Sequence, residues 1–144
     1  MLHYNFIFNS IGVDAKATFK GMTTAFGSNM LRPKFVVSMK TDSSCTRFTY
    51  YGSHNDYING VNQLNDRQLL EAIDCFFSDA SCYDNARSFE DFCEELGYTS
   101  MSQYKEAKRA YDGCKRHYDA AFRLFGSCVW DAADSVREQI EDMD

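Results

Sequence analysis

Apolar residues recur every three or four positions from Tyr104 to Phe125, and this heptad spacing constrains the fold more than any other feature of the sequence. The run comprises Tyr104, Ala107, Tyr111, Cys114, Tyr118, Ala121 and Phe125. Such a seam predicts one long helix with a continuous apolar face. Ser100 and Gln103 match a capping box before it, and Gly126 follows it. We expect the seam to pack within this chain's own bundle, as a monomer; a coiled-coil dimer is the alternative.

Three further helices are predicted in the second half of the chain. The first starts at Asn65 or Asp66 and carries one apolar stripe, formed by Leu69, Leu70, Ile73, Phe76 and Phe77. A short helix follows Ser88, a good N-cap, and stops at Gly97. The last helix begins at about Cys128.

The first half of the chain predicts strands. Residues 2–8 alternate between apolar and polar side chains, as in a half-buried strand. Residues 34–39 and 46–51 are rich in β-branched and aromatic side chains, and turn-forming residues lie between them, which predicts a hairpin preceded by Pro33. Residues 14–27 fit either a helix or a strand, and residues 52–64 resemble a loop.

Together these segments predict an α+β fold in which a small N-terminal antiparallel sheet packs against a C-terminal bundle of three to four helices. A length of 144 residues fits one domain, 1–144, mainly β over 1–52 and mainly helical over 65–142. No apolar run approaches the ~18 residues that span a bilayer, and the first residues lack the pattern of a signal peptide. We therefore expect a cytoplasmic protein whose six cysteines are mostly small buried residues without disulfides.

Charge is distributed unevenly. The net charge is −6, yet residues 1–60 carry six basic and three acidic side chains. Residues 66–95 carry nine acids against two bases, and residues 131–144 carry six acids against one base. This balance repels nucleic acid and attracts basic surfaces, so we expect no direct nucleic-acid contact.

The nine acids of the middle third are the candidate partner-binding residues. They are Asp66, Glu71, Asp74, Asp79, Asp84, Glu90, Asp91, Glu94 and Glu95. One interpretation is a solvated face that keeps the protein in solution. The other is a surface that stands in for DNA phosphates and competes for a basic nucleic-acid channel.

Patterns for catalysis and cofactors are weak. Ser53, His54 and Asp56 are sequence neighbours, whereas a catalytic triad converges from separate elements. Cys114 and His117 lie one helical turn apart, and Cys75, Cys82 or Cys93 would have to complete a zinc site, but no Cys-x-x-Cys pair exists. Glycine-rich phosphate loops are missing. We expect a protein that is not an enzyme and has no catalytic residues, metal or cofactor.

A resemblance to a known group of proteins rests on three stretches. They are residues 48–53, residues 69–80 and, most specifically, Ser88-Phe89-Glu90-Asp91-Phe92-Cys93-Glu94-Glu95-Leu96-Gly97-Tyr98. Tyr111-x-x-Cys114 and Leu124-Phe125-Gly126 extend the similarity. The pattern, which covers roughly residues 34–126, is similar to that of a family of small accessory proteins encoded by bacteriophages and prophages. Anti-CRISPR proteins are found among such phage genes. The resemblance implies a viral protein acting in the host bacterial cytoplasm, and it supplies no catalytic residues.

These observations lead to one functional hypothesis and two rivals. The hypothesis is a phage anti-defence protein, an anti-CRISPR inhibitor that acts as a DNA mimic by placing its acidic helices on a basic surface of a CRISPR–Cas nuclease or surveillance complex. The first rival is a phage protein that binds another host factor, such as polymerase or a repressor. The second rival is a small metal-dependent enzyme. Whether the Ser88–Tyr98 string is structural or functional is left open by the sequence.

Overall fold

The chain folds into a four-stranded sheet followed by helices, and the α+β prediction is confirmed. The computed structural model describes residues 2–8, 11–24 and 29–143. The elements are β1 Leu2–Phe8, β2 Ile11–Thr24, β3 Leu31–Lys40, β4 Cys45–Tyr51, α1 His54–Ile58, α2 Asp66–Asn85, α3 Phe89–Leu96, the 3-10 turn η1 Met101–Gln103, α4 Tyr104–Phe125, the 3-10 turn η2 Gly126–Cys128 and α5 Val129–Asp142.

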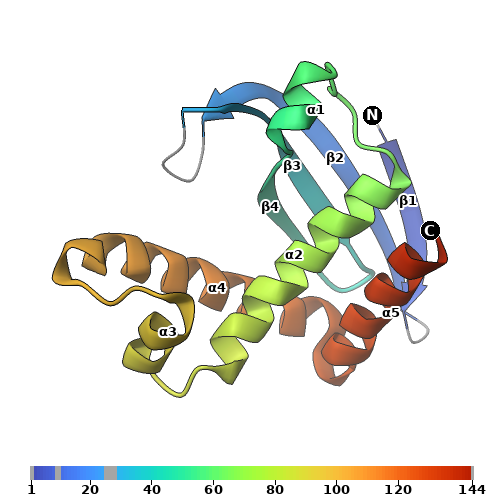
Figure 1. Cartoon of the computed structure of the whole chain (residues 1–144). Helices are drawn as coiled ribbons and strands as arrows, with labels where there is room; N and C mark the ends of the chain where they lie inside the picture. Colours follow the sequence, from blue (N-terminus) through green and yellow to red (C-terminus); the bar gives the residue numbers. More distant parts are fainter. Residues whose placement is uncertain (1, 9–10, 25–28, 144) are drawn as a thin grey trace.

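The sheet is an antiparallel meander in the order β1-β2-β3-β4 (Figure 1). The predicted hairpin of β3 and β4 is confirmed, and Thr41 closes its turn by donating its N–H to the Ser44 carbonyl over 2.9 Å. Pro33, predicted to precede the strand, lies inside β3 opposite Met22. The register of β2 shifts between Phe19 and Met22, next to this proline, which has no N–H to donate to a regular ladder.

Two segments of the first half differ from their predictions. Residues 52–64 are not all loop, because α1 forms at His54. Ser53 and Asp56 cap it reciprocally, a signal that the sequence contained. The segment 14–27 belongs to β2 as far as Thr24, and its remainder lies outside the described residues. The strand at residues 2–8 is confirmed, but the side chains of its predicted alternation, Leu2, Tyr4, Phe6 and Phe8, also lie outside them.

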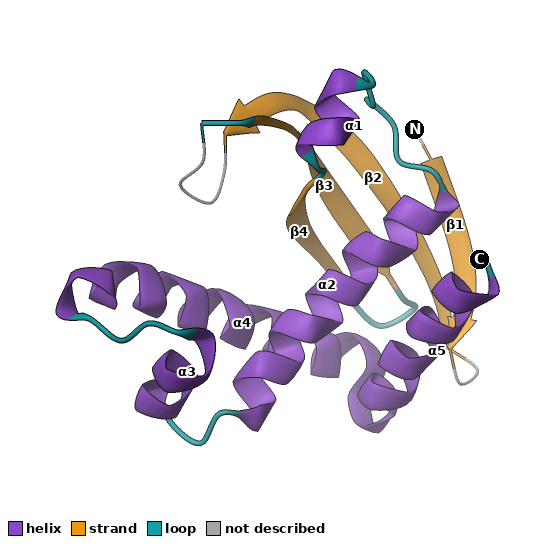
Figure 2. Cartoon of the chain, viewed as in Figure 1, coloured by secondary structure: helices purple, strands orange, loops and turns teal. Residues whose placement is uncertain are grey.

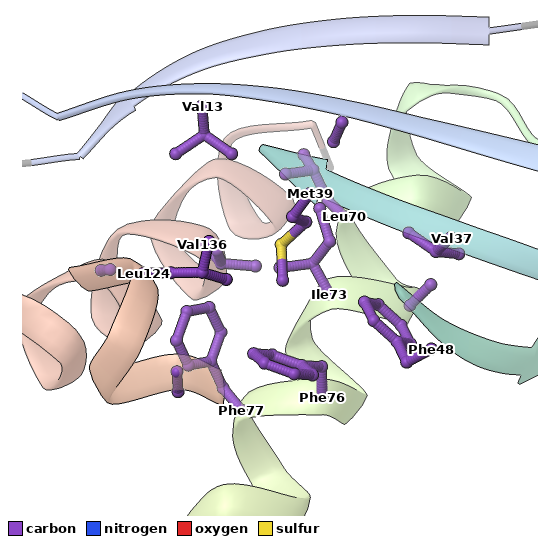
Figure 3. Packing of buried hydrophobic residues seen from close by; sticks show 14 of the residues in the cluster. Val13, Val37, Met39, Phe48, Leu70, Ile73, Phe76, Phe77, Leu124 and Val136 are labelled. Atoms are coloured by element: carbon purple, nitrogen blue, oxygen red, sulfur yellow. The ribbon is translucent and has the colours of Figure 1, made fainter. Parts of the chain in front are cut away.

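The core fills the space between one face of the sheet and the helices. Every second residue of β2 and β3 points into it, including Val13, Val37 and Met39 (Figure 3). The predicted stripe of α2 meets this face, and Phe76 stacks on Phe48 with ring centroids 5.0 Å apart. α5 adds Val136 and other small side chains beside α2 (Figures 1 and 3).

The predicted helix boundaries are confirmed, with Asn65 and Ser88 as N-caps and Gly97 in the left-handed conformation after α3. The heptad seam packs inside the chain: the Tyr83 ring of α2 lies 5.4 Å from Tyr111 and 5.0 Å from Tyr118. None of the helices in the described ranges has the length and apolar character needed to cross a bilayer.

Replacing Phe76 by alanine should destabilise the fold. Phe76 is 1% exposed and contacts the rings of Phe48, Phe77 and His117, so truncation leaves a cavity at the junction of sheet and helices. We expect a loss of about 3–5 kcal/mol in the free energy of unfolding, measured by urea denaturation. Met101→Ala is the control, because Met101 is 90% exposed, and it should change stability by less than about 0.5 kcal/mol. A loss below about 1 kcal/mol for Phe76→Ala would contradict this packing.

Candidate functional site

The nine predicted acidic residues are spread over α2 and α3. Asp66 opens α2 and Asp84 lies at its other end. At 1.5 Å rise per residue, these two positions are about 27 Å apart along the helix. The remaining acids lie along α2 between them or on α3. The nine carboxylates therefore extend over two helices, and whether they contact a partner stays a prediction.

Four of the nine carboxylates are held by groups of the same chain. The contacts are Arg67 Nε to Glu71 Oε1 at 3.0 Å, Arg137 Nε to Asp74 Oδ1 at 3.3 Å, His117 Nδ1 to Asp79 Oδ2 at 2.9 Å, and the Arg87 N–H to Asp91 Oδ2 at 3.0 Å. Asp74 joins α2 to α5, and Asp79 joins α2 to α4. These acids have a structural role, and arginine partly neutralises the charges of Glu71 and Asp74.

The other five carboxylates make no ion pair or hydrogen bond with the residues that the structure describes. They are Asp66, Asp84, Glu90, Glu94 and Glu95, and all are exposed. Three of them belong to α3. Ser88 starts this short helix by accepting the Asp91 N–H over 3.1 Å, and Gly97 ends it. The unpaired acidity of the middle third is therefore concentrated on α3.

Aromatic contacts fix α3 to the first half of α4. The Phe92 ring is buried and lies edge-on to Tyr111 at 5.1 Å. Phe89 contacts both Tyr104 and Tyr111, at 5.8 and 5.3 Å. The Lys108 ammonium lies 5.5 Å from the centre of the Phe89 ring, which adds a cation–π contact. α3 and the start of α4 project away from the sheet (Figure 1).

Exposed apolar residues lie beside the acids of α3. Met101 is 90% exposed and Tyr104 is 55% exposed. Both line a hollow of about 220 Å³ whose wall also includes Cys93 of α3. Glu90 lies one helical turn before Cys93 and one turn before Glu94, so its side chain is a neighbour of both on α3. We call Glu90, Cys93, Glu94, Met101 and Tyr104 the elbow surface.

The serine, histidine and aspartate considered for nucleophilic catalysis serve the start of α1. Ser53 Oγ accepts the Asp56 N–H over 3.2 Å, and Asp56 Oδ2 accepts the Ser53 N–H over 2.9 Å. His54 Nδ1 lies 3.1 Å from the Leu31 carbonyl oxygen. Ser53 and Asp56 therefore cap α1 and His54 contacts β3, whereas a catalytic triad needs hydrogen bonds from serine to histidine and from histidine to aspartate.

Cys75, Cys82 and Cys114 have raised pKa values, which disfavour the thiolate form that a nucleophile or a metal ligand requires. Burial, then the charges of Asp79 and Cys82, raises the pKa of Cys114 to about 12. Desolvation by surrounding atoms, then nearby carboxylates, also raises the pKa of Cys82 and of Cys75, although part of Cys75 is exposed to solvent. His117, the other member of the considered zinc pair, is bonded to Asp79. Among the described residues, no three His, Cys, Asp or Glu side chains are placed to hold a metal ion.

The expectation that most cysteines are buried is wrong. Cys114 is buried, whereas Cys45 and Cys75 are exposed and Cys82, Cys93 and Cys128 are intermediate. All six are free thiols. The periodicity of β4 and α2 places Cys45 and Cys75 on the outer sides of these elements. The hydrophobic character of a thiol is too weak to change that position.

Sequence analysis missed two features. The first is the exposed pair Met101 and Tyr104, because Tyr104 was assigned to the buried seam. The second is a set of basic residues on the outer face of the sheet, such as Lys16, Lys20 and Lys34. The signal in the sequence was that basic residues occupy alternate positions along β2 and β3, which point to one face. Comparison with known proteins adds no further assignment: no family model, curated protein or solved structure matches this chain.

Cys114 should resist alkylation in the folded protein. With a pKa of about 12, its thiolate fraction at pH 9 is on the order of one in a thousand, and its side chain is only 8% exposed. Iodoacetamide labelling followed by peptide mass spectrometry should find Cys45 modified and Cys114 unmodified until urea is added. Equal labelling of both cysteines in the native protein would restore the possibility of a cysteine nucleophile.

Proposed function

We propose that this protein is a non-catalytic inhibitor that binds a basic surface of a host nucleic-acid-binding effector through the elbow surface. The observation that carries the proposal is that α3 holds unpaired carboxylates and also contributes Cys93 to the hollow lined by the exposed Met101 and Tyr104, in the part of the molecule that projects away from the sheet.

The carboxylates supply the electrostatic part of the recognition. Glu90 and Glu94 lie one turn apart on a helix with no basic residue in its last turn. Complementary charge steers association and disfavours wrong partners. Lysine and arginine side chains that normally contact phosphates would provide the matching surface.

The apolar residues argue for a protein partner. An interface core needs apolar or aromatic side chains that leave water on binding, and Tyr and Met are enriched at such cores. Met101 and Tyr104 supply these groups within the same surface as the acids. A nucleic acid would be repelled by the carboxylates, so a basic protein surface with an apolar element is the better match.

The identity of the effector rests on the resemblance of residues 88–98 to phage-encoded accessory proteins. Most of this string builds the helix that carries the elbow: Ser88 caps it, Phe89 and Phe92 attach it, and Gly97 ends it. We propose a CRISPR–Cas complex as the partner, and blockage of its DNA or guide surface as the mode of inhibition.

The test has two stages. A panel of bacterial strains, each with one active CRISPR–Cas type, identifies the type whose plasmid interference the protein suppresses. The purified effector of that type is then assayed for target-DNA binding in the presence of the wild-type protein or the Glu90→Lys/Glu94→Lys variant. We expect the variant to require at least about tenfold more protein for half-inhibition, since reversing two interfacial charges costs more than about 1.4 kcal/mol.

The matched control is Glu138→Lys/Glu141→Lys, which makes the same charge change at exposed positions of α5. This control should inhibit within about twofold of the wild type, because distant exposed charges contribute little. Met101→Ser, an exposed apolar change, should weaken inhibition without altering the melting temperature. Equal inhibition by the elbow variant and the control would reject the elbow as the contact surface. Unaffected interference in every strain would reject a CRISPR effector as the partner.

A further inference from the structure

The outer face of the sheet carries basic side chains and is not covered by helices. α2 and α5 pack on the opposite face (Figures 1 and 2), and the buried residues of β2 and β3 alternate with partly or fully exposed ones. The outward residues include five cations, which we call the cationic sheet face: Lys16, Lys20, Lys34, Lys40 and Arg47.

The strand register places four of these cations in two rows. Lys16 of β2 pairs with Ser38 of β3, which pairs with Arg47 of β4. Four residues before Ser38 in β3, Lys34 lies beside the bulge that contains Lys20. At about 3.3 Å per residue, the two rows are about 13 Å apart.

A row of two threonines and one valine separates the two rows of cations. Between them, Thr18 pairs with Val36, which pairs with Thr49. A hollow of about 180 Å³ lies over this region, lined by Lys16, Thr18, Lys20, Val36, Ser38 and Arg47. Three cations and two hydroxyl groups therefore surround one depression, and these are the groups that bind phosphate oxygens in proteins.

These cations are available to a ligand. In the part of the chain that the structure describes, Lys16, Lys20, Lys34 and Arg47 form no ion pair or hydrogen bond through their side chains. Asp14, the acid that shares this face, pairs in the sheet with Lys40 and lies outside the two rows. The local charge is thus positive, although the chain as a whole carries −6.

We propose that the cationic sheet face binds the phosphate backbone of a single-stranded nucleic acid. The chain would cross the sheet so that phosphates meet the Lys16–Arg47 row and the Lys20–Lys34 row, with the hydroxyls of Thr18 and Ser38 between them. This site is separate from the elbow surface and does not depend on it. An inhibitor with both surfaces could hold an effector and the strand that the effector displaces or exposes.

A single strand fits this face better than a duplex or a membrane. Sequence-specific duplex recognition places a helix or a β-ribbon in a groove, whereas this face is an open sheet with the helices behind it. Membrane surfaces are bound through apolar side chains as well as cations, and Val36 is the one apolar side chain in the wall of the hollow.

Binding is tested with the full chain and a fluorescein-labelled oligothymidylate of about 20 nucleotides, by fluorescence anisotropy at low salt. If four cations neutralise phosphates, the logarithmic salt slope is about −2.8, so affinity should fall about 50-fold between 50 and 200 mM salt. Lys16→Gln/Arg47→Gln and Lys20→Gln/Lys34→Gln should each weaken binding at least about fivefold and reduce the slope by about 1.4.

The matched control is Lys105→Gln/Lys115→Gln, which removes two exposed charges from α4 and should bind within about twofold of the wild type. Circular dichroism confirms that each variant is folded. Absence of binding at low salt, or an equal loss in the control, would overturn the proposal. Tighter binding to a duplex of the same length, or to phosphatidylserine vesicles, would overturn the assignment of a single strand. None of these results bears on inhibition through the elbow surface, which is measured separately.

Discussion

The packing of α2 against one face of the sheet is the interaction on which the rest of the structure depends. Val37, Met39 and Phe48 from the sheet meet Ile73 and Phe76 from α2, and all are nearly or completely buried (Figure 3). Because strand side chains alternate, burying this face leaves the other one to polar residues. α2 also extends past the sheet, where it supports α4 and, through α4, the short helix α3 (Figure 1).

This geometry keeps an acidic surface on α3 apart from a basic surface on the sheet. The net charge of the whole chain gives no sign of this separation. The unpaired acids of α3 and the apolar residues beside them lie at the end that projects from the body, whereas the cations of β2, β3 and β4 lie on the far side of the sheet. Internal contacts hold part of the acidic groups near the core: Arg137 pairs with Asp74, and His117 contacts Asp79. The acidity of the middle third is therefore partly structural, and α3 retains the portion that is available to a partner.

Much of the fold could be predicted from the sequence, because its signals were local. Asn65, Ser88 and Gly97 act on adjacent backbone groups, so the limits of α2 and α3 followed from residue type and spacing. The site was harder to predict. Whether Asp74 is free depends on Arg137, more than 60 positions away, and no local pattern reports that contact. The expectation of no direct nucleic-acid contact rested on the charge of the whole chain and stays a prediction; it did not take into account the alternation that gathers Lys16, Lys34 and Arg47 on one face.

Segregation of charge between the sheet and α3 is the central claim, and solvent paramagnetic relaxation in NMR measures it residue by residue. Amide protons are compared in the presence of an anionic and a cationic nitroxide of similar size. The structure predicts stronger relaxation by the anionic probe at Thr18, Val36 and Ser38, and stronger relaxation by the cationic probe at Glu90 and Glu94. Equal effects of the two probes at both places, or the same sign at both, would contradict the account.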